Sequence, residues 1–190
     1  MGLTDIKKEL KKLDKNKLLY LVADLYKKNK SVKEYFDFYL DPNERALFDK
    51  NRRKIFEAFY PKRGFGYKLK EGKQAISDFK KLGTSSDLLV DLMLFYVETG
   101  IKFTNDFGDV DESFYLSLEK TYAQALTLMK RENLLDKFAD RSSKVIKDTD
   151  GIGWGFHDCL TQVYSDFYTD FSGYDNEEKG KSKLIKLSGK

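Results

Sequence analysis

The residue types that could do chemistry gather in residues 148–159, which hold the only His, the only Trp and the only Cys of the chain. Carboxylates beside a His can exchange protons or coordinate a metal ion near neutral pH. His157 and Cys159 are two positions apart on an expected helix, so they do not face each other as a nucleophilic pair. The candidate residues for a small acid/base or metal site are therefore Asp148, Asp150, His157 and Asp158.

Known motifs do not fit this segment. Its Asp-x-Asp-Gly run is similar to a calcium loop, but an EF-hand alignment would place Ile146 and His157 at the first and last ligand positions. Its alternating glycines could cradle a phosphate, but no strand precedes them, so neither a dinucleotide fingerprint nor a P-loop is indicated. A structural alternative stays open, in which the glycines form a tight turn, Trp154 and Phe156 pack on the core, and His157 binds a nearby carboxylate.

A second segment, residues 61–71, is the one clearly irregular stretch of the chain. Its first positions from Arg63 match the RNA-recognition octamer, but Lys68 and Lys70 stand where Val and an aromatic residue are required. Helices are expected on both sides, so we interpret the match as accidental. A basic, aromatic loop could still bind phosphates and stack bases, or its aromatics could pack on the core while its lysines face water. The candidate nucleic-acid-binding residues are Lys62, Arg63, Phe65, Tyr67, Lys68 and Lys70.

A third segment carries four carboxylates within residues 106–112. Such a cluster could hold a hard cation. The alternative is that one helix ends here and the next begins, because acidic residues stabilise the positive end of a helix. No motif in the chain predicts a cofactor or a defined metal site.

Apolar residues recur with helical spacing along the chain and predict eight or nine helices without strands. The most apolar run, residues 88–97, is interrupted only by Asp91 and predicts a buried central helix over residues 86–106. A buried Asp91 needs a partner, such as an Arg, a Tyr hydroxyl or a helix N-terminus. The predicted fold class is all-α, an irregular bundle or stacked hairpins in a single domain over residues 1–171, followed by a polar, flexible tail over residues 172–190.

Helix boundaries are predicted from capping residues. Starts are expected at Ser31 and Asp41, whose side chains can accept hydrogen bonds from the free N–H groups of a first turn. A further start is expected at Asp111, because acidic residues suit the positive end of a helix. Ends are expected at Gly83 and Gly108, because glycine readily adopts the left-handed conformation that closes a helix.

Charge is unevenly distributed along the 190 residues. Residues 1–80 carry 21 Lys and Arg against 12 Asp and Glu, whereas residues 81–170 carry 9 against 16. This asymmetry could steer a polyanion to the basic half, or it could let the two halves attract each other. The single Cys excludes an intramolecular disulfide. No apolar leader follows Met1, which predicts a cytoplasmic protein without a membrane anchor.

Five segments of the chain carry a resemblance to a known family, namely Tyr35–Glu44, Phe59–Gly64, Asp91–Leu94, Tyr96–Glu98 and Gly151–Asp158. Together they resemble an uncharacterised bacterial family, the domain of unknown function 6155. The resemblance covers about residues 5–170, and it implies an all-helical, cytoplasmic bacterial protein. It supplies no activity, substrate or catalytic residue.

Three functional hypotheses follow. The first is a protein-interaction or scaffold module, because the chain is helical, 15% aromatic, charged outside and without a qualifying catalytic constellation. The second is a nucleic-acid-binding accessory protein that uses the basic N-terminal half. The third is an acid/base or metal site at residues 148–158. An enzyme is not favoured, and the oligomeric state is open.

Overall fold

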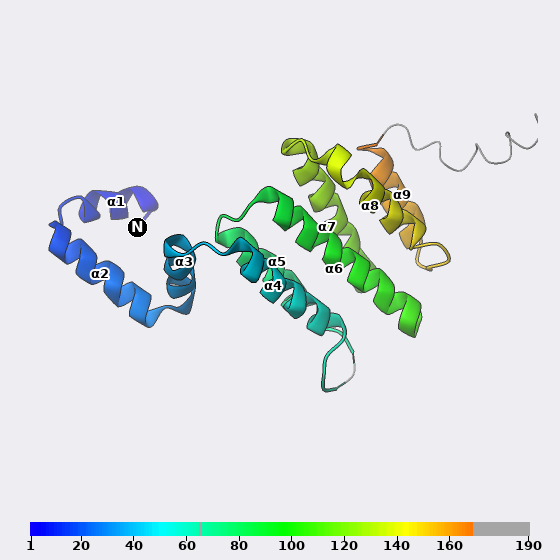
Figure 1. Ribbon diagram of the computed structural model, residues 1–190, viewed down its shortest axis with the longest axis horizontal. Coiled ribbons are helices and arrows are strands. Elements are labelled where there is room, and N and C mark those ends of the chain that lie inside the picture. Colours follow the sequence, from blue (N-terminus) through cyan, green and yellow to red (C-terminus); the bar gives the residue numbers. More distant parts are fainter. Residues whose placement is uncertain (65, 169–190) are drawn as a thin grey trace, which may run out of the picture. The chain divides into compact units, whose positions relative to one another are not determined.

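The computed structural model describes residues 1–64 and 66–168 (Figure 1). These residues form nine α-helices and no strand, which confirms the all-α fold class. The tail predicted over residues 172–190 lies outside the described residues. The helices are α1 (Leu3–Leu10), α2 (Lys15–Lys28), α3 (Lys30–Leu40), α4 (Glu44–Phe59), α5 (Leu69–Lys81), α6 (Ser86–Phe107), α7 (Glu112–Arg131), α8 (Leu135–Lys147) and α9 (Phe156–Ser165).

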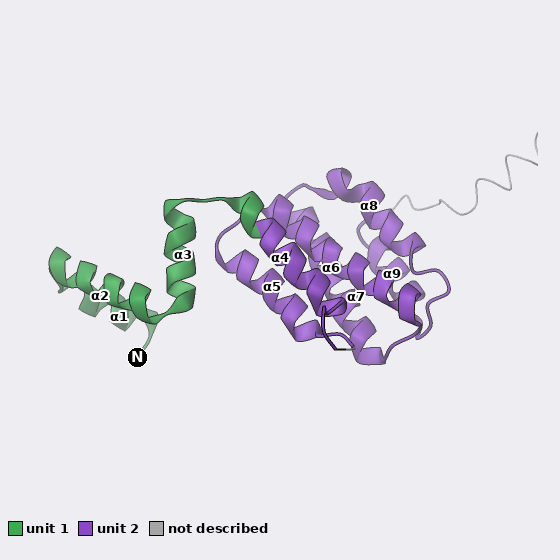
Figure 2. Ribbon diagram, turned by 60° about the horizontal axis from the view of Figure 1, so that its bottom comes forward, with its two compact units in different colours: residues 1–47 green, residues 48–190 purple. Residues whose placement is uncertain are grey.

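Contacts divide the chain into two compact units, Met1–Leu47 and Phe48–Lys190 (Figure 2). In the first unit, α2 and α3 pack against each other. Their contact includes a polar cluster in which the Tyr26 hydroxyl donates to the Asp37 carboxylate (2.7 Å) and Lys33 pairs with the same carboxylate (2.8 Å). None of the residues of α1, α2 or α3 is buried. The first unit therefore holds together without a core of its own.

Two helix starts differ from the predicted ones because Asn supplies the cap. The Asn29 side chain accepts from the backbone N–H of Ser31 (3.0 Å) and so caps α3. The Asn43 side chain accepts from Ala46 N–H (2.9 Å) at the start of α4. Asn caps a helix as well as Ser or Asp does, so each start lies two residues from the predicted cap. The third prediction is confirmed, since Asp111 caps α7.

The second unit is built around α6, the helix predicted over residues 86–106. Twelve of the 22 residues of α6 are buried, and the helix packs against α5, α7 and α8. Its C-terminal end is Gly108, as predicted, with a φ of 92° that favours glycine. Helix α9 packs against α7 and α8. Burial on several sides explains why residues 88–97 of α6 are apolar except for Asp91.

An aromatic cluster joins α4, α6 and α7. The Phe59 ring lies 5.1 Å from the Tyr96 ring and 6.0 Å from the Phe114 ring, centroid to centroid, in edge-to-face arrangements. The Tyr96 hydroxyl is buried and hydrogen-bonds the Ser117 hydroxyl (2.9 Å). Burial raises the pKa of Tyr96 to about 12. Tyr96 is therefore neutral at ordinary pH and serves as a packed aromatic residue with its polar end satisfied.

The Leu118 side chain of α7 packs directly against the backbone of α6 at Gly100. A Cβ atom at this position would lie 2.5 Å from the Leu118 Cδ2 atom, and the Leu118 side chain is fully buried. A side chain at position 100 would therefore collide with Leu118.

Replacing Gly100 with Ala should lower the free energy of unfolding by about 1–2 kcal/mol. Overpacking costs roughly 1–3 kcal/mol and outweighs the ~1 kcal/mol that Ala gains over Gly in a helix. Urea denaturation followed by circular dichroism would measure the change. In a Leu118→Ala background the same substitution should cost much less, because the added methyl group then has room. Equal costs in both backgrounds would show that the close contact is not the cause.

Candidate functional site

The turn between α8 and α9 is anchored by one buried hydroxyl. The Thr149 Oγ1 atom donates to the Ile146 carbonyl (2.6 Å) and also lies 2.8 Å from Nδ1 of His157. Because a hydroxyl has one proton, this geometry assigns the second hydrogen bond to a proton on His157 Nδ1. The structural alternative expected a carboxylate as the partner of His157, and the structure places the Thr149 hydroxyl there instead.

The four predicted acid/base residues do not form one cluster. Asp148 pairs with Lys144, one turn earlier on α8, and Asp150 and Asp158 are exposed. No hydrogen bond or ion pair in the described residues joins His157 to any of the three carboxylates. Throughout residues 1–64 and 66–168, no three His, Cys, Asp or Glu side chains come close enough to hold a metal ion. Catalytic roles for these residues stay a prediction.

The third segment packs against this turn, a contact that sequence reasoning missed. The Asp109 carboxylate accepts from the Tyr115 hydroxyl (2.8 Å) and from the Gly153 backbone N–H (3.3 Å). A Cβ atom on Gly153 would lie 2.5 Å from Asp109 Oδ2, so a glycine is needed for this approach. Trp154 follows with a φ of 60° and a 62% exposed side chain, whereas Phe156 is buried. The structural alternative is thus correct for Phe156 and wrong for Trp154.

The predicted nucleic-acid-binding loop is partly engaged in local ion pairs. Lys62 pairs with Glu57 (3.1 Å), and Lys68 pairs with Glu71 (3.0 Å). Arg63 and Lys70 are exposed, with no ion pair in the part of the chain that the structure describes. Phe65 lies outside the described residues. Two of the four loop cations are therefore partly neutralised by carboxylates of the same chain, which weakens the attraction of this loop for a nucleic-acid backbone.

Tyr67 from the same loop is packed against the start of α7. Its ring lies 4.9 Å from the Phe114 ring, centroid to centroid, and its hydroxyl donates to Asp111 (2.6 Å). Burial and the Asp111 carboxylate raise the pKa of Tyr67 to about 12. Hydrogen bonds from the Ser113 hydroxyl, the Tyr67 hydroxyl and the Phe114 N–H lower the pKa of Asp111 to about 2. Asp111 therefore caps α7 and fixes the loop at the same time.

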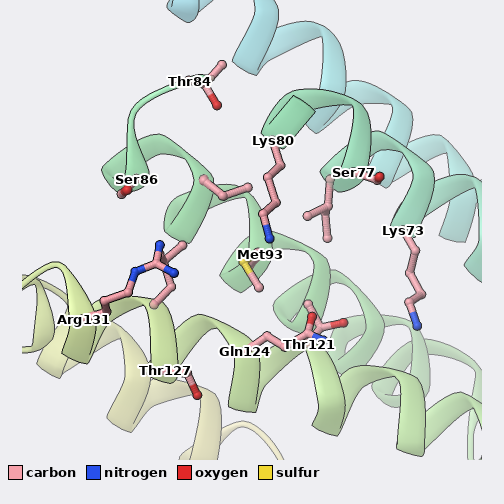
Figure 3. A pocket seen from close by; sticks show the side chains of 13 residues that line it. Lys73, Ser77, Lys80, Thr84, Ser86, Met93, Thr121, Gln124, Thr127 and Arg131 are labelled. Atoms are coloured by element: carbon pink, nitrogen blue, oxygen red, sulfur yellow. The ribbon is translucent and has the colours of Figure 1, made fainter. Parts of the chain in front are cut away.

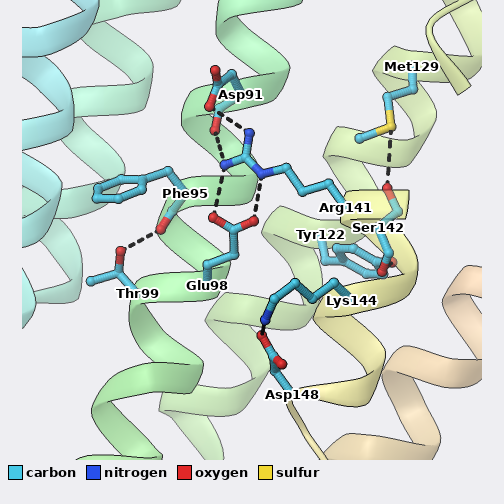
Figure 4. A network of polar contacts seen from close by, with 10 residues as sticks. All are labelled: Asp91, Phe95, Glu98, Thr99, Tyr122, Met129, Arg141, Ser142, Lys144 and Asp148. Atoms are coloured by element: carbon cyan, nitrogen blue, oxygen red, sulfur yellow. Dashed lines mark hydrogen bonds and ion pairs between the residues drawn. The ribbon is translucent and has the colours of Figure 1, made fainter. Parts of the chain in front are cut away.

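Asp91 has the partner that its burial required. Arg141 on α8 donates to the Asp91 carboxylate through Nη1 (2.7 Å) and to both oxygens of Glu98 through Nε (2.6 Å) and Nη2 (2.9 Å). Figure 4 shows the guanidinium group held between the two carboxylates of α6. All three side chains are about two-thirds buried. The two-pronged contact with Glu98 is the geometry in which Arg binds carboxylates most strongly.

A groove of about 630 Å³ lies along α5, α6 and α7 in the second unit. Three cationic side chains and no carboxylate line it, and Figure 3 shows Lys80 from α5 and Arg131 from α7 reaching into the same space. This site was not found from the sequence, because its residues are scattered over three helices. Its lining residues are Lys73, Ile76, Ser77, Lys80, Thr84, Ser86, Leu89, Met93, Thr121, Gln124, Thr127, Leu128 and Arg131.

The first unit presents an apolar face to solvent. Three residues of α2 at helical spacing, Leu21, Val22 and Leu25, are 42%, 39% and 46% exposed. We call these three residues the α2 stripe. Further large apolar side chains of the unit are exposed on α1, α2 and α3, namely Leu3, Ile6, Leu19, Tyr20, Tyr35, Tyr39 and Leu40.

Comparison with protein families shows where the chain belongs. A family model, described as a family of unknown function (DUF6155), matches residues 1–168. The chain belongs to this family. The expected resemblance is thereby confirmed, and its extent includes every helix described above.

Membership in DUF6155 supplies no activity, so the function has to be inferred from the chain itself. No curated protein matches this DUF6155 chain, and no solved structure does. In the described residues, no helix combines the length and apolar character needed to cross a lipid bilayer. Bacterial origin and a cytoplasmic location stay predictions.

The low pKa of Asp111 predicts a specific loss of stability in acid. Its folded-state pKa of about 2 lies below the ordinary value of 3.8, so the ionised carboxylate stabilises the fold above about pH 4. This contribution is lost as the pH falls from 4 towards 2. Asp111→Asn, which keeps a good helix cap, should flatten the dependence of the unfolding free energy on pH in that window. Urea titrations at several pH values would measure it. Asp150→Asn is the matched control and should keep the wild-type slope.

Arg141→Ala should destabilise the second unit by about 1–3 kcal/mol, because it leaves Asp91 and Glu98 partly buried without their cation. Lys137→Ala provides a control on the same helix, since Lys137 makes one exposed ion pair with Asp87 of α6. This control should cost at most about 1 kcal/mol. Thermal and urea unfolding would compare the two variants. Equal losses would mean that the Arg141 contacts contribute no more than a surface pair.

Proposed function

We propose that this DUF6155 chain is a protein-interaction module that self-associates through its first unit. The observation that carries the proposal is that α1, α2 and α3 bury none of their residues while presenting apolar side chains at helical spacing. A helical unit with no core gains little from folding alone, because buried apolar surface is what offsets the lost chain entropy. A second protein surface would supply that burial.

The exposed apolar side chains of the first unit support a protein contact. Ten large apolar residues of this unit are 39% to 77% exposed. Contiguous apolar surface on a soluble protein marks an interaction site more often than not. The α2 stripe is the part of this surface whose helical spacing places its side chains on one face.

The partner that we propose is a second copy of the chain, joined through the same face. In a two-fold arrangement the α2 stripe of each copy packs against its counterpart, and the same residues are covered on both sides. The periodicity of α2 places Lys27 on the side opposite to the stripe, so the lysine stays in water. The unit carries 11 Lys and Arg against 8 Asp and Glu, a small excess that does not prevent close contact.

The two other hypotheses have less support. In the predicted nucleic-acid-binding loop, Lys62 and Lys68 are in ion pairs and Tyr67 is packed. In the predicted acid/base segment, His157 binds Thr149 and no carboxylate joins it. Self-association needs neither of these segments.

Analytical ultracentrifugation over a range of concentrations would test the dimer. The expected result is a species of about twice 22.2 kDa whose population rises with concentration and does not fall with added salt. Replacing both Leu21 and Leu25 with Asp should shift it to the monomer, because two carboxylates would be buried at the contact.

The control is Lys27→Asp, which changes the charge of α2 by the same amount on its opposite side and should leave the dimer intact. Fluorescence of Trp154, the only Trp and part of the second unit, would report that this unit stays folded in every variant. A monomer at all concentrations would overturn the proposal. A dimer that dissociates when salt is added, or that persists in the variant with both Asp substitutions, would also overturn it.

A further inference from the structure

We propose that the groove along α5, α6 and α7 binds a small organic phosphate of nucleotide size. The groove lies within the second unit, so the proposal is independent of self-association through the first. Its volume of about 630 Å³ falls within the range of about 300–1,000 Å³ that is usual for small-molecule sites.

The charge of the groove selects an anion. Lys73, Lys80 and Arg131 line it without a lining carboxylate. Neither lysine forms an ion pair in the described residues. The carboxylate nearest in sequence to Arg131 is that of Glu132, which accepts a hydrogen bond from Nε of Arg131 (2.8 Å). Both Nη groups of the guanidinium remain available to a ligand. Guanidinium and ammonium groups are the side chains that bind phosphate most often.

Nearby carboxylates do not neutralise these cations. Asp78 on α5 accepts a hydrogen bond from Gln74 (2.6 Å), and Asp87 at the start of α6 pairs with Lys137 of α8. Neither carboxylate lines the groove. The first turn of α6 also borders the groove at Ser86, where free backbone N–H groups and the positive helix end add to the attraction for an anion.

Free hydrogen-bond donors in the groove outnumber free acceptors. Three lining hydroxyls already donate to carbonyls, those of Thr84 to Phe79 (3.1 Å), Thr121 to Ser117 (2.8 Å) and Thr127 to Ala123 (2.8 Å). The hydroxyls of Ser77 and Ser86 and the amide of Gln124 make no hydrogen bond in the described residues. These groups can donate to phosphate oxygens or to the hydroxyls of a sugar.

The floor of the groove is apolar, so a ligand that fits it also has an apolar part beside its phosphate. Leu89 and Met93 of α6 and Leu128 of α7 line the groove and are almost fully buried. Lys80 follows Lys73 by seven positions on α5, which places their backbones about 10 Å apart along the helix. A ligand with a phosphate near Lys80 and Arg131 and a flat, apolar body over Met93 would use both parts of the groove (Figure 3).

Isothermal titration calorimetry with ADP, adenosine and pyrophosphate as probes would test the proposal. ADP should bind at least about tenfold more tightly than either of the other two, because only ADP combines a phosphate with an apolar body. Lys80→Gln and Arg131→Gln should each weaken ADP binding about tenfold or more, since each removes a charge-assisted hydrogen bond.

The matched controls are Lys81→Gln and Lys130→Gln, adjacent residues on α5 and α7 that do not line the groove. Both should bind ADP as the wild type does. All four substitutions are at exposed positions, so the fold should persist. Absence of ADP binding would overturn the proposal, as would equal binding of adenosine or pyrophosphate, or equal effects of groove and control variants.

A lipid headgroup offers the same phosphate chemistry from another source. Vesicles of phosphatidylcholine with and without phosphatidic acid would distinguish the two in a co-sedimentation assay. The proposal expects no binding to either vesicle. Binding to phosphatidic acid that Lys80→Gln abolishes, without ADP binding, would assign the groove to a lipid and overturn the small-molecule proposal.

Discussion

The burial of α6 is the constraint on which the second unit depends. A helix that is covered on several sides must be apolar around most of its circumference, and every polar group that it carries needs a partner. Asp91 and Glu98 are two turns apart on the side that faces α8. One guanidinium group, that of Arg141, satisfies both. The ion pairs therefore determine how α8 docks as much as its apolar residues do, because a shift along the axis would break two contacts together.

The same burial explains where the groove forms. Both α5 and α7 pack on α6, so α6 forms the floor of the groove that lies between them. Leu89 and Met93 therefore serve as core residues and as the lining of an open site. Further along α6, at Gly100, the Leu118 side chain of α7 occupies the space that a side chain of α6 would need.

The predictions from the sequence were correct for features that depend on residues close together in the chain. The periodic apolar pattern predicted α6 to within one residue, and Asp111 and Gly108 marked helix boundaries correctly. The caps at Asn29 and Asn43 were missed because several residues near a helix start can cap it, and only the backbone path selects one. The need of Asp91 for a partner was also local, and Arg was among the partners predicted. The identity of that Arg could not be predicted, because Arg141 is 50 positions from Asp91 in the sequence and the apolar periodicity says nothing about such distant contacts.

The candidate sites also show that contacts between residues distant in sequence could not be predicted. Residues 148–158 attracted attention because rare residue types lie close together in sequence, yet their side chains diverge and bind neighbours such as Thr149 and Lys144. Lys73, Lys80 and Arg131 are ordinary surface residues in the sequence, and only the packing of three helices brings them around one groove. A contrast between the two units follows. In the second unit the two carboxylates of α6 that face α8 are paired with Arg141, and three cations line the groove beside α6. In the first unit the exposed side chains of the α2 stripe are apolar, which is why the proposal for that unit is a protein contact and the proposal for the groove is an anionic ligand.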